Sequence, residues 1–133
     1  MSKPVVRTLL PGWPHEELLY ETIDDGKIAI ITMNRPERMN ASDPGMAQRW
    51  VDAWTTFADD DDCWVAIVTG AGERAFSAGQ DLKIRADLEE QGGNAPYTRR
   101  ARSVVPIGEK LGCWKPTIAA INGYAIAGGW SVA

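Results

Sequence analysis

Two short segments carry the backbone groups best suited to chemistry. The first spans residues 75–83 and reads AFSAGQDLK, and the second spans residues 115–129 and reads KPTIAAINGYAIAGG. Each is an apolar strand pattern followed by a turn of small residues and a predicted helix start. A helix start exposes unpaired backbone N–H groups, and its dipole favours negative charge. Two such groups directed at one point could stabilise an oxyanion; the alternative is two ordinary strand-to-helix turns.

Other residue types argue against several kinds of catalytic site. His15 is the one histidine in the sequence and lies in the proline-rich N-terminal arm, which argues against histidine-based triads and multi-histidine metal sites within this part of the protein. Residues 59–62 read DDDD and indicate a solvated turn, because a metal site needs carboxylates at defined spacing with carbonyl partners. Residues 70–73 read GAGE and lack the third glycine of a dinucleotide fingerprint. Cys63 and Cys113 lack CxxC spacing and are predicted to be buried free thiols.

Charge and hydropathy narrow the class of protein further. The chain has 18 acidic and 14 basic residues, a net charge of −4 and a pI of about 4.9, which disfavours nucleic acid as a partner. An anionic ligand would have to be held by local Lys, Arg and backbone N–H groups. The sequence shows no charged-then-apolar leader and no long apolar run. We therefore expect a cytoplasmic protein with no signal peptide and no membrane partner.

Hydrophobic periodicity predicts the elements that position the two turns. Residues 1–15 are rich in proline and are predicted to form an irregular arm. Residues 18–23 and 27–33 read as strands joined by an Asp-Asp-Gly hairpin turn at 24–26. Asp43 and Pro44 are the predicted N-cap and first residue of a helix. The apolar stripe of that helix repeats at helical spacing and is expected in the core; its members are Met46, Trp50, Val51, Trp54, Phe57 and Ala58.

The second half of the chain predicts a crossover and further helices. Residues 63–69 form a continuous apolar run, which favours a strand buried on both faces and completes a strand–helix–strand crossover. Residues 81–91 and 98–112 read as helices, and Pro106 should break or kink the second. Residues 117–121 read as a strand, after which Asn122-Gly123 turns the chain toward a final helix. No stop signal follows, so we expect the chain to be cut inside that helix.

Four blocks together resemble the enoyl-CoA hydratase/isomerase family, also called the crotonase family. They are the two segments above, residues 31–41 (ITMNRPERMNA) and residues 64–72 (WVAIVTGAG). Each block alone is a weak signal, but all four occur in the family's order and at familiar spacing. The resemblance implies an α/β fold, the crotonase-like ββα spiral, of which this chain holds only the N-terminal portion. It also implies two regions: an irregular arm at 1–15, and residues 16–133 as part of a crotonase-like domain truncated at its C-terminal end.

The resemblance assigns roles to five residues. Gln80 and Gly128 match the positions whose backbone N–H groups bind the thioester oxygen. Ala78 matches the position whose backbone contacts the adenine of coenzyme A. Lys83 lies where a basic side chain often meets coenzyme A phosphates, although it is equally well read as a solvated lysine. Ser131 stands where authentic hydratases carry a catalytic glutamate, and a serine hydroxyl needs an activating partner to act as a base.

These matches imply an enzyme that processes acyl-CoA through a thioester enolate held in an oxyanion hole. Coenzyme A enters as part of the substrate, and no separate cofactor or metal is expected. Because Ser131 replaces the glutamate, a non-hydratase crotonase (isomerase, hydrolase or decarboxylase type) stays open, as does a catalytically inactive acyl-CoA-binding fragment or paralogue. By resemblance the partner is a second copy, in a trimer or hexamer, or a second chain that carries the missing half. Asp81 is interpreted as a structural helix cap.

Overall fold

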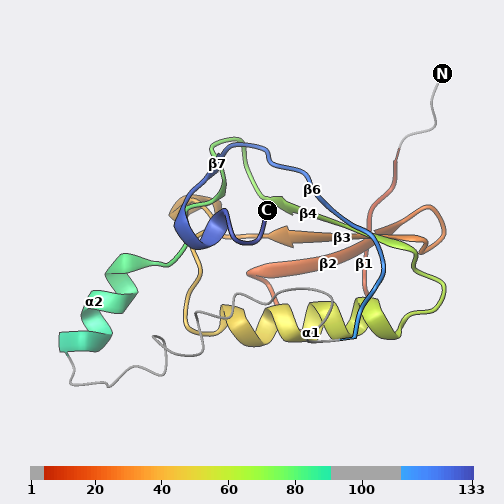
Figure 1. Ribbon diagram of the computed structural model, residues 1–133, viewed down its shortest axis with the longest axis horizontal. Coiled ribbons are helices and arrows are strands. Elements are labelled where there is room, and N and C mark those ends of the chain that lie inside the picture. The colour runs from red at the N-terminus through yellow and green to blue at the C-terminus, as the bar shows by residue number, and fades with distance from the viewer. Residues whose placement is uncertain (1–4, 91–111) are drawn as a thin grey trace.

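A five-stranded mixed sheet and one long helix form the body of the protein (Figure 1). The computed structural model describes residues 5–90 and 112–133. The main sheet has the order β1-β2-β3-β4-β6, and β5 and β7 form a separate two-stranded sheet. The elements in chain order are β1 (Thr8–Leu9), β2 (Leu18–Ile23), β3 (Ile28–Met33), η1 (Pro36–Arg38), α1 (Met46–Asp59), β4 (Val65–Gly70), β5 (Ala75–Ser77), α2 (Leu82–Glu90), β6 (Thr117–Ala119), β7 (Tyr124–Ala125) and η2 (Ala127–Gly129).

The predicted hairpin is confirmed. β2 and β3 pair antiparallel from Leu18↔Met33 to Ile23↔Ile28. All three turn residues have positive φ, at 53° for Asp24, 54° for Asp25 and 87° for Gly26. Asp and Gly adopt this left-handed region at lower cost than most residues. The local sequence therefore favours the turn that joins the two strands.

Helix α1 covers one face of the sheet (Figure 1), and its predicted stripe is largely confirmed. The buried side chains of the helix are Met46, Trp50, Ala53, Trp54 and Phe57, whereas Val51 and Ala58 are only partly buried. The predicted N-cap was wrong: Gly45 occupies that position, without a side-chain cap. The Asp43 carboxylate instead accepts a hydrogen bond from Arg49 Nη1 at 2.6 Å. Arg49 lies in the first turn of the helix and offers the carboxylate a charged partner.

The crossover places β4 parallel to β3 on one side and to β6 on the other. Residues along β4 alternate between buried and half-buried, so the prediction of burial on both faces was wrong. Within the described residues, α1 seals the buried face and the opposite face is only partly covered. β6 is three residues long and ends at Ala119, two residues earlier than predicted.

The N-terminal arm is less irregular than expected. Thr8 and Leu9 pair with β2, and Trp13 Nε1 donates a hydrogen bond to the Leu18 carbonyl at 2.7 Å. His15 Nε2 lies 2.7 Å from Asp52 Oδ2 on α1, a contact that the sequence did not predict. The arm therefore contributes an edge strand to the sheet and a polar contact between His15 and helix α1.

The two cysteines behave as predicted. Cys63 and Cys113 are both free and buried. Burial raises the pKa of the Cys63 thiol, and the nearby Asp60 carboxylate raises it further. Burial also raises the pKa of Tyr20 well above its ordinary value, with Cys63 and Asp60 adding to the effect.

Residues 60–63 form a turn in which Asp60 Oδ1 accepts the Asp62 N–H at 3.0 Å.

The final segment differs most from prediction. Residues after Gly123 were expected to enter an α-helix, but they form β7 and then the 3-10 helix η2. β7 pairs with β5, which lies far earlier in the chain. The local sequence therefore gave no sign of this strand. The helix predicted at 98–112 and the loop before it lie outside the described residues, apart from Gly112. Among the helices in the described ranges, none has the length and apolarity needed to cross a membrane.

Candidate active site

The two small-residue turns lie against each other. β5 pairs with β7, and the Ile126 N–H donates to the Ser77 carbonyl at 2.9 Å. Gly79 has a φ of +86°, and a Cβ there would lie 3.0 Å from the Gly128 nitrogen. A Cβ at Gly129 would overlap the Ser77 carbonyl oxygen. Glycine is therefore required on both turns, because each backbone occupies space that a side chain would take.

The backbone around Gln80 is fixed by a parallel bridge to Ser42. The Ser42 N–H donates to the Gly79 carbonyl at 2.7 Å, and the Asp81 N–H donates to the Ser42 carbonyl at 3.0 Å. In a parallel ladder, one residue bonds the neighbours on either side of its partner. The N–H and C=O of Gln80 consequently face away from Ser42. Within residues 5–90 and 112–133, the Gln80 N–H donates no hydrogen bond.

Gly128 lies in the middle of η2. Ala127 before it has a φ of +50°, and the hydrogen bonds of this turn run from Gly129 N–H to the Ile126 carbonyl and from Trp130 N–H to the Ala127 carbonyl. In the part of the chain that the structure describes, the Gly128 N–H has no acceptor. Among the described residues, each of the two turns thus has one backbone N–H without an acceptor. That both donors point at one ligand oxygen stays a prediction.

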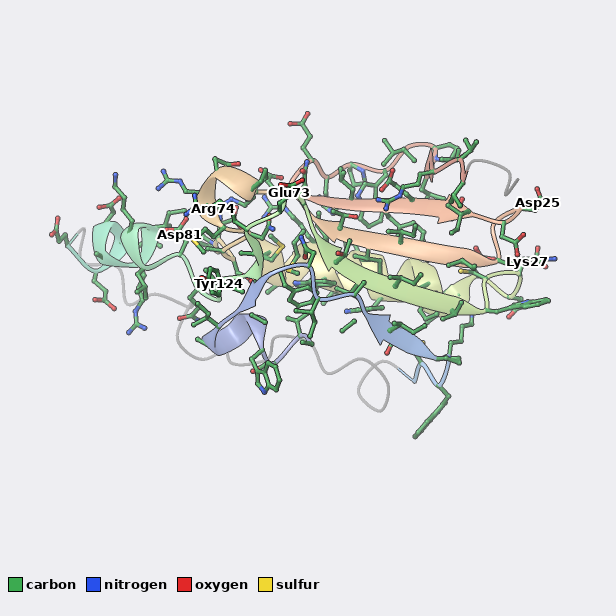
Figure 2. The ribbon with its side chains drawn as sticks, turned by 90° about the horizontal axis from the view of Figure 1, so that it is seen from above. Asp25, Lys27, Glu73, Arg74, Asp81 and Tyr124 are labelled. Carbon is green, nitrogen blue, oxygen red and sulfur yellow. The ribbon has the colours of Figure 1, made fainter. Side chains whose placement is uncertain are left out.

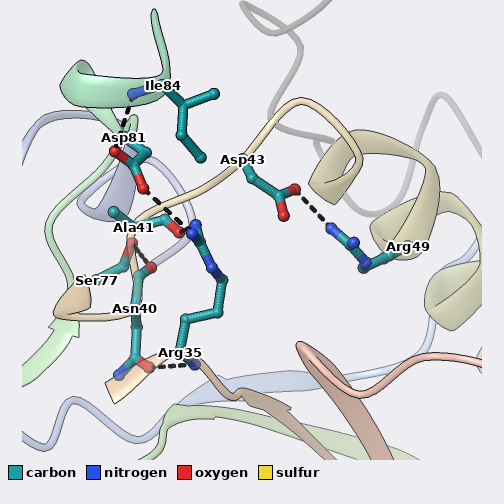
Figure 3. A network of polar contacts seen from close by, with 8 residues as sticks. All are labelled: Arg35, Asn40, Ala41, Asp43, Arg49, Ser77, Asp81 and Ile84. Carbon is teal, nitrogen blue, oxygen red and sulfur yellow. Dashed lines mark hydrogen bonds and ion pairs between the residues drawn. The ribbon is translucent and has the colours of Figure 1, made fainter. Parts of the chain in front are cut away.

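A buried polar cluster holds the first turn from behind (Figure 3). Asn40, in the left-handed region with a φ of 54°, accepts the Arg35 N–H at 3.0 Å and donates to the Ala75 carbonyl at 2.8 Å. The Ser77 hydroxyl donates to the Asn40 carbonyl at 2.9 Å and accepts the Gly79 N–H at 3.2 Å. Buried polar groups satisfied in this way rigidify a loop. The sequence contained Asn40 and Ser77 within the matched blocks, but gave them no role.

Asp81 links the first turn to α2 and to Arg35. Its Oδ1 accepts the Ile84 N–H at 3.4 Å, which confirms the interpretation of Asp81 as a helix cap. Its Oδ2 lies 3.2 Å from Arg35 Nη2, and Arg35 Nη1 also donates to the Ala41 carbonyl. The ion pair was missed, because the two residues are far apart in sequence and neither is marked by a local pattern. Figure 2 shows Asp81 and Tyr124 in the part of the molecule that carries α2, with Asp25 and Lys27 at the opposite end.

The other three predicted residues are placed differently. Ala78 belongs to the first turn, and its N–H donates to the Met39 carbonyl at 2.9 Å. Lys83 is exposed in the first turn of α2, and Ser131 is exposed just after η2. Among the described residues, neither side chain has a hydrogen-bonding partner. Their ligand contacts stay predictions.

Known proteins with similar sequences and structures share one family description. The profile of the enoyl-CoA hydratase/isomerase family matches residues 24–133. An (E)-benzylidenesuccinyl-CoA hydratase from Thauera aromatica is 40% identical over 106 residues, which cover 80% of this chain and 40% of the relative. A carnitinyl-CoA dehydratase from Salmonella arizonae is 41% identical over 115 residues, covering 82% and 40%.

The solved structure of an enoyl-CoA hydratase from Mycobacterium tuberculosis superposes with a TM-score of 0.66 at 37% identity. That match covers 88% of this chain and 42% of the other. The chain thus spans about two fifths of the length of the relatives it matches.

Proposed function

The chain belongs to the enoyl-CoA hydratase/isomerase family, with the α/β architecture of a partial crotonase domain, and from this premise we propose that it binds an acyl-CoA thioester and stabilises the enolate formed from it. The observation that carries the proposal is the contact between two glycine-bearing turns. In each turn, one backbone N–H has no acceptor among the described residues. Relatives of this chain are named hydratases and dehydratases of acyl-CoA compounds.

The proposed chemistry depends on the backbone. Loss of a proton alpha to a thioester carbonyl places negative charge on the carbonyl oxygen, and the N–H groups of Gln80 and Gly128 would donate to that oxygen. Removing one preorganised donor of this kind typically lowers kcat by about 10²–10³-fold. The Ala78 carbonyl would accept from the adenine amino group of coenzyme A, and the exposed Lys83 would contact its phosphates.

Ser131 decides which reaction in the family we expect. It is exposed, and no base in the described residues hydrogen-bonds to its hydroxyl, so it has no visible means of deprotonating water. We therefore propose acyl-CoA binding with little hydration of a simple enoyl-CoA such as crotonyl-CoA. This observation favours the second candidate, a crotonase of isomerase, hydrolase or decarboxylase type whose base comes from elsewhere. Assembly as a trimer or hexamer, or with a second chain, and a cytoplasmic location remain parts of the proposal.

The test compares two ligands that differ in one oxygen. Butyryl-CoA is a thioester, whereas S-butyl-CoA is a thioether without the carbonyl. We define the thioester preference as the dissociation constant of S-butyl-CoA divided by that of butyryl-CoA, measured by calorimetry. Two donors to the carbonyl should make this ratio well above one. A ratio of one in the native protein would contradict the proposed function.

A single-atom change tests Gly128 itself. The sequence has Gly112 next to Cys113, a natural junction for joining a synthetic peptide of residues 113–133 to the rest of the chain. Glycolic acid at position 128 replaces the N–H by an ester oxygen, and we expect the thioester preference to fall about tenfold, since a hydrogen bond to a polarised acceptor contributes about 1–2 kcal/mol. The matched control is the corresponding ester at Ile121, made with the α-hydroxy acid that keeps the isoleucine side chain, and it should leave the ratio unchanged.

A further inference from the structure

The direction of the Gln80 N–H is set by contacts that do not involve Gln80 itself. The two backbone hydrogen bonds through Ser42 fix the residues before and after it. The Gly79 carbonyl and the Gln80 N–H belong to one trans peptide, so the hydrogen bond from the Ser42 N–H to that carbonyl points the Gln80 N–H the opposite way. Whatever holds the Ser42 segment against the turn therefore also holds the direction of this N–H. Asp81, the next residue, is the one side chain of the turn that carries a charge.

The Asp81 carboxylate is held from two sides. One oxygen accepts the Ile84 N–H and thereby fixes the start of α2. The other oxygen pairs with Arg35 at 3.2 Å. The side chains of Arg35 and Asp81 are only 12% and 6% exposed, so water screens the pair weakly.

Arg35 also holds the strand on the opposite side of the bridge. Its second guanidinium nitrogen donates to the Ala41 carbonyl, and its own backbone N–H is bound by Asn40. One planar guanidinium therefore ties the residue before Ser42 to the residue after Gln80. Lysine, with a single ammonium group, cannot reproduce that fork.

We propose that Arg35 and Asp81 are positioning residues that aim the Gln80 N–H at the carbonyl oxygen of the bound thioester. This inference rests on the proposed acyl-CoA function. The pair touches no reacting atom; it acts by holding Ala41 and Asp81, on the two sides of the Ser42 bridge, and that bridge orients the Gly79–Gln80 peptide that carries the N–H. Its loss should cost recognition of the carbonyl oxygen more than recognition of the rest of the ligand.

The thioester preference separates positioning from mere support of the fold. Asp81→Asn keeps the shape of the side chain and an oxygen for the Ile84 N–H, but removes the charge that binds Arg35. Arg35→Met removes the fork and keeps an apolar stem. We expect each variant to lower the thioester preference about tenfold, corresponding to about 1.4 kcal/mol, while the dissociation constant of S-butyl-CoA changes less than threefold.

The chain offers a matched control pair. Asp43 and Arg49 form a similar ion pair at 2.6 Å, with side chains 16% and 17% exposed, at the start of α1 (Figure 3). Asp43→Asn and Arg49→Met should lower the melting temperature and leave the thioester preference unchanged. Arg35→Lys, which keeps a charge beside Asp81, should restore part of the preference lost in Arg35→Met and provides a milder variant if either fails to fold.

The outcomes are distinct. A native preference above one that Asp81→Asn, Arg35→Met and Arg35→Lys all leave unchanged overturns the positioning role and leaves the proposed function standing. A native preference of one overturns both. Equal losses in the Arg35–Asp81 and Asp43–Arg49 variants would show a general effect of stability and overturn the inference. A loss confined to the Arg35–Asp81 variants, with partial recovery in Arg35→Lys, supports it.

Discussion

The sheet–helix layer, made of β2, β3, β4 and α1, and the C-terminal segment, residues 112–133, place their large aromatic side chains in opposite environments. Trp50, Trp54 and Phe57 in the layer are buried, at most 3% exposed. Trp114 and Trp130 in the segment are 83% and 68% exposed. The layer is therefore held by apolar burial, which contributes about 1.5–3 kcal/mol for each large side chain. The segment adds only smaller side chains to the core, namely Cys113, Ala119, Ala125 and Val132, so it needs other means of attachment as well.

Hydrogen bonds between side chains of the segment and backbone groups of the layer supply those means. Lys115 Nζ donates to the Phe57 carbonyl at 2.8 Å and to the Asp60 carbonyl, at the C-terminal end of α1, where a cation is favoured. Asn122 exchanges hydrogen bonds with Gly70 in both directions, at 2.8 and 3.2 Å. Gly129 lets the segment approach Ser77 without a side chain between them. The second turn is thus attached largely by hydrogen bonds to main-chain groups, whereas the first follows Phe76, which is buried in the packed core.

The largest expected effect is in the layer. Trp54→Ala removes a side chain that is 1% exposed and contacts Trp50 and Phe57. The loss of buried area and the cavity left behind should cost about 3–5 kcal/mol of unfolding free energy. Urea denaturation measures it. A loss below 1 kcal/mol would show that α1 is not the main support of the sheet.

The next effect is local to the segment. Gly129→Ala forces a Cβ into the Ser77 carbonyl, and overpacking of this kind costs about 1–3 kcal/mol. We expect β7 to detach from β5, so that the Ile126 and Tyr124 N–H groups lose protection in hydrogen exchange. Gly45→Ala is the control, because Gly45 has a negative φ of −79° and the atoms nearest to a Cβ there belong to the flexible end of the Arg49 side chain. Retained protection in Gly129→Ala would refute the close approach.

Alkaline pH should distinguish the two regions through their tyrosines. Because the pKa of Tyr20 is raised by burial, the unfolded chain releases the phenol proton first. Its contribution to stability is complete below the unfolded pKa of about 10 and is lost as the pH rises above that value, with a slope of about 1.4 kcal/mol per pH unit for one proton. Tyr20→Phe should flatten this decline. Tyr124→Phe, at an exposed position, should not; equal curves for both variants would contradict the prediction.

The smallest effect belongs to the exposed tryptophan. Trp130→Ala should change the unfolding free energy by no more than about 0.5 kcal/mol, as for most exposed positions. The measurement is made in parallel with Trp54→Ala. Both variants replace tryptophan by alanine, so only the environment of the side chain differs. A cost near that of Trp54→Ala would mean that Trp130 is covered in solution by a copy or a partner.

Much of the layer could be predicted because its signals are local. The Asp-Asp-Gly turn specifies the β2–β3 hairpin within a few residues. The recurrence of Met46, Trp50, Trp54 and Phe57 specifies the buried face of α1 without knowledge of the sheet. The two glycine turns were also found from their small residues, and the structure brings them into contact through β5 and β7.

The failures arise where distant residues compete. Asp43 has the right side chain for an N-cap, but Arg49 offers it a charged partner. The Arg35–Asp81 pair joins residues 46 positions apart, and no periodicity links them. Alternation of burial along β4 depends on what covers its second face, which the β4 sequence does not encode.

The pairing of β6 with β4 has a consequence for the order of assembly. The β2–β3 hairpin closes across a short turn, whereas Thr117 must find Ala66 across a long stretch of chain that includes β5 and α2. Loop-closure entropy grows with the length of chain enclosed, and distant strand pairings form slowly. We expect the hairpin to fold early and the edge strand to add last. During synthesis, the turn at Gln80 is made before the turn at Gly128, so the two turns come into contact only after β7 has been made and has paired with β5.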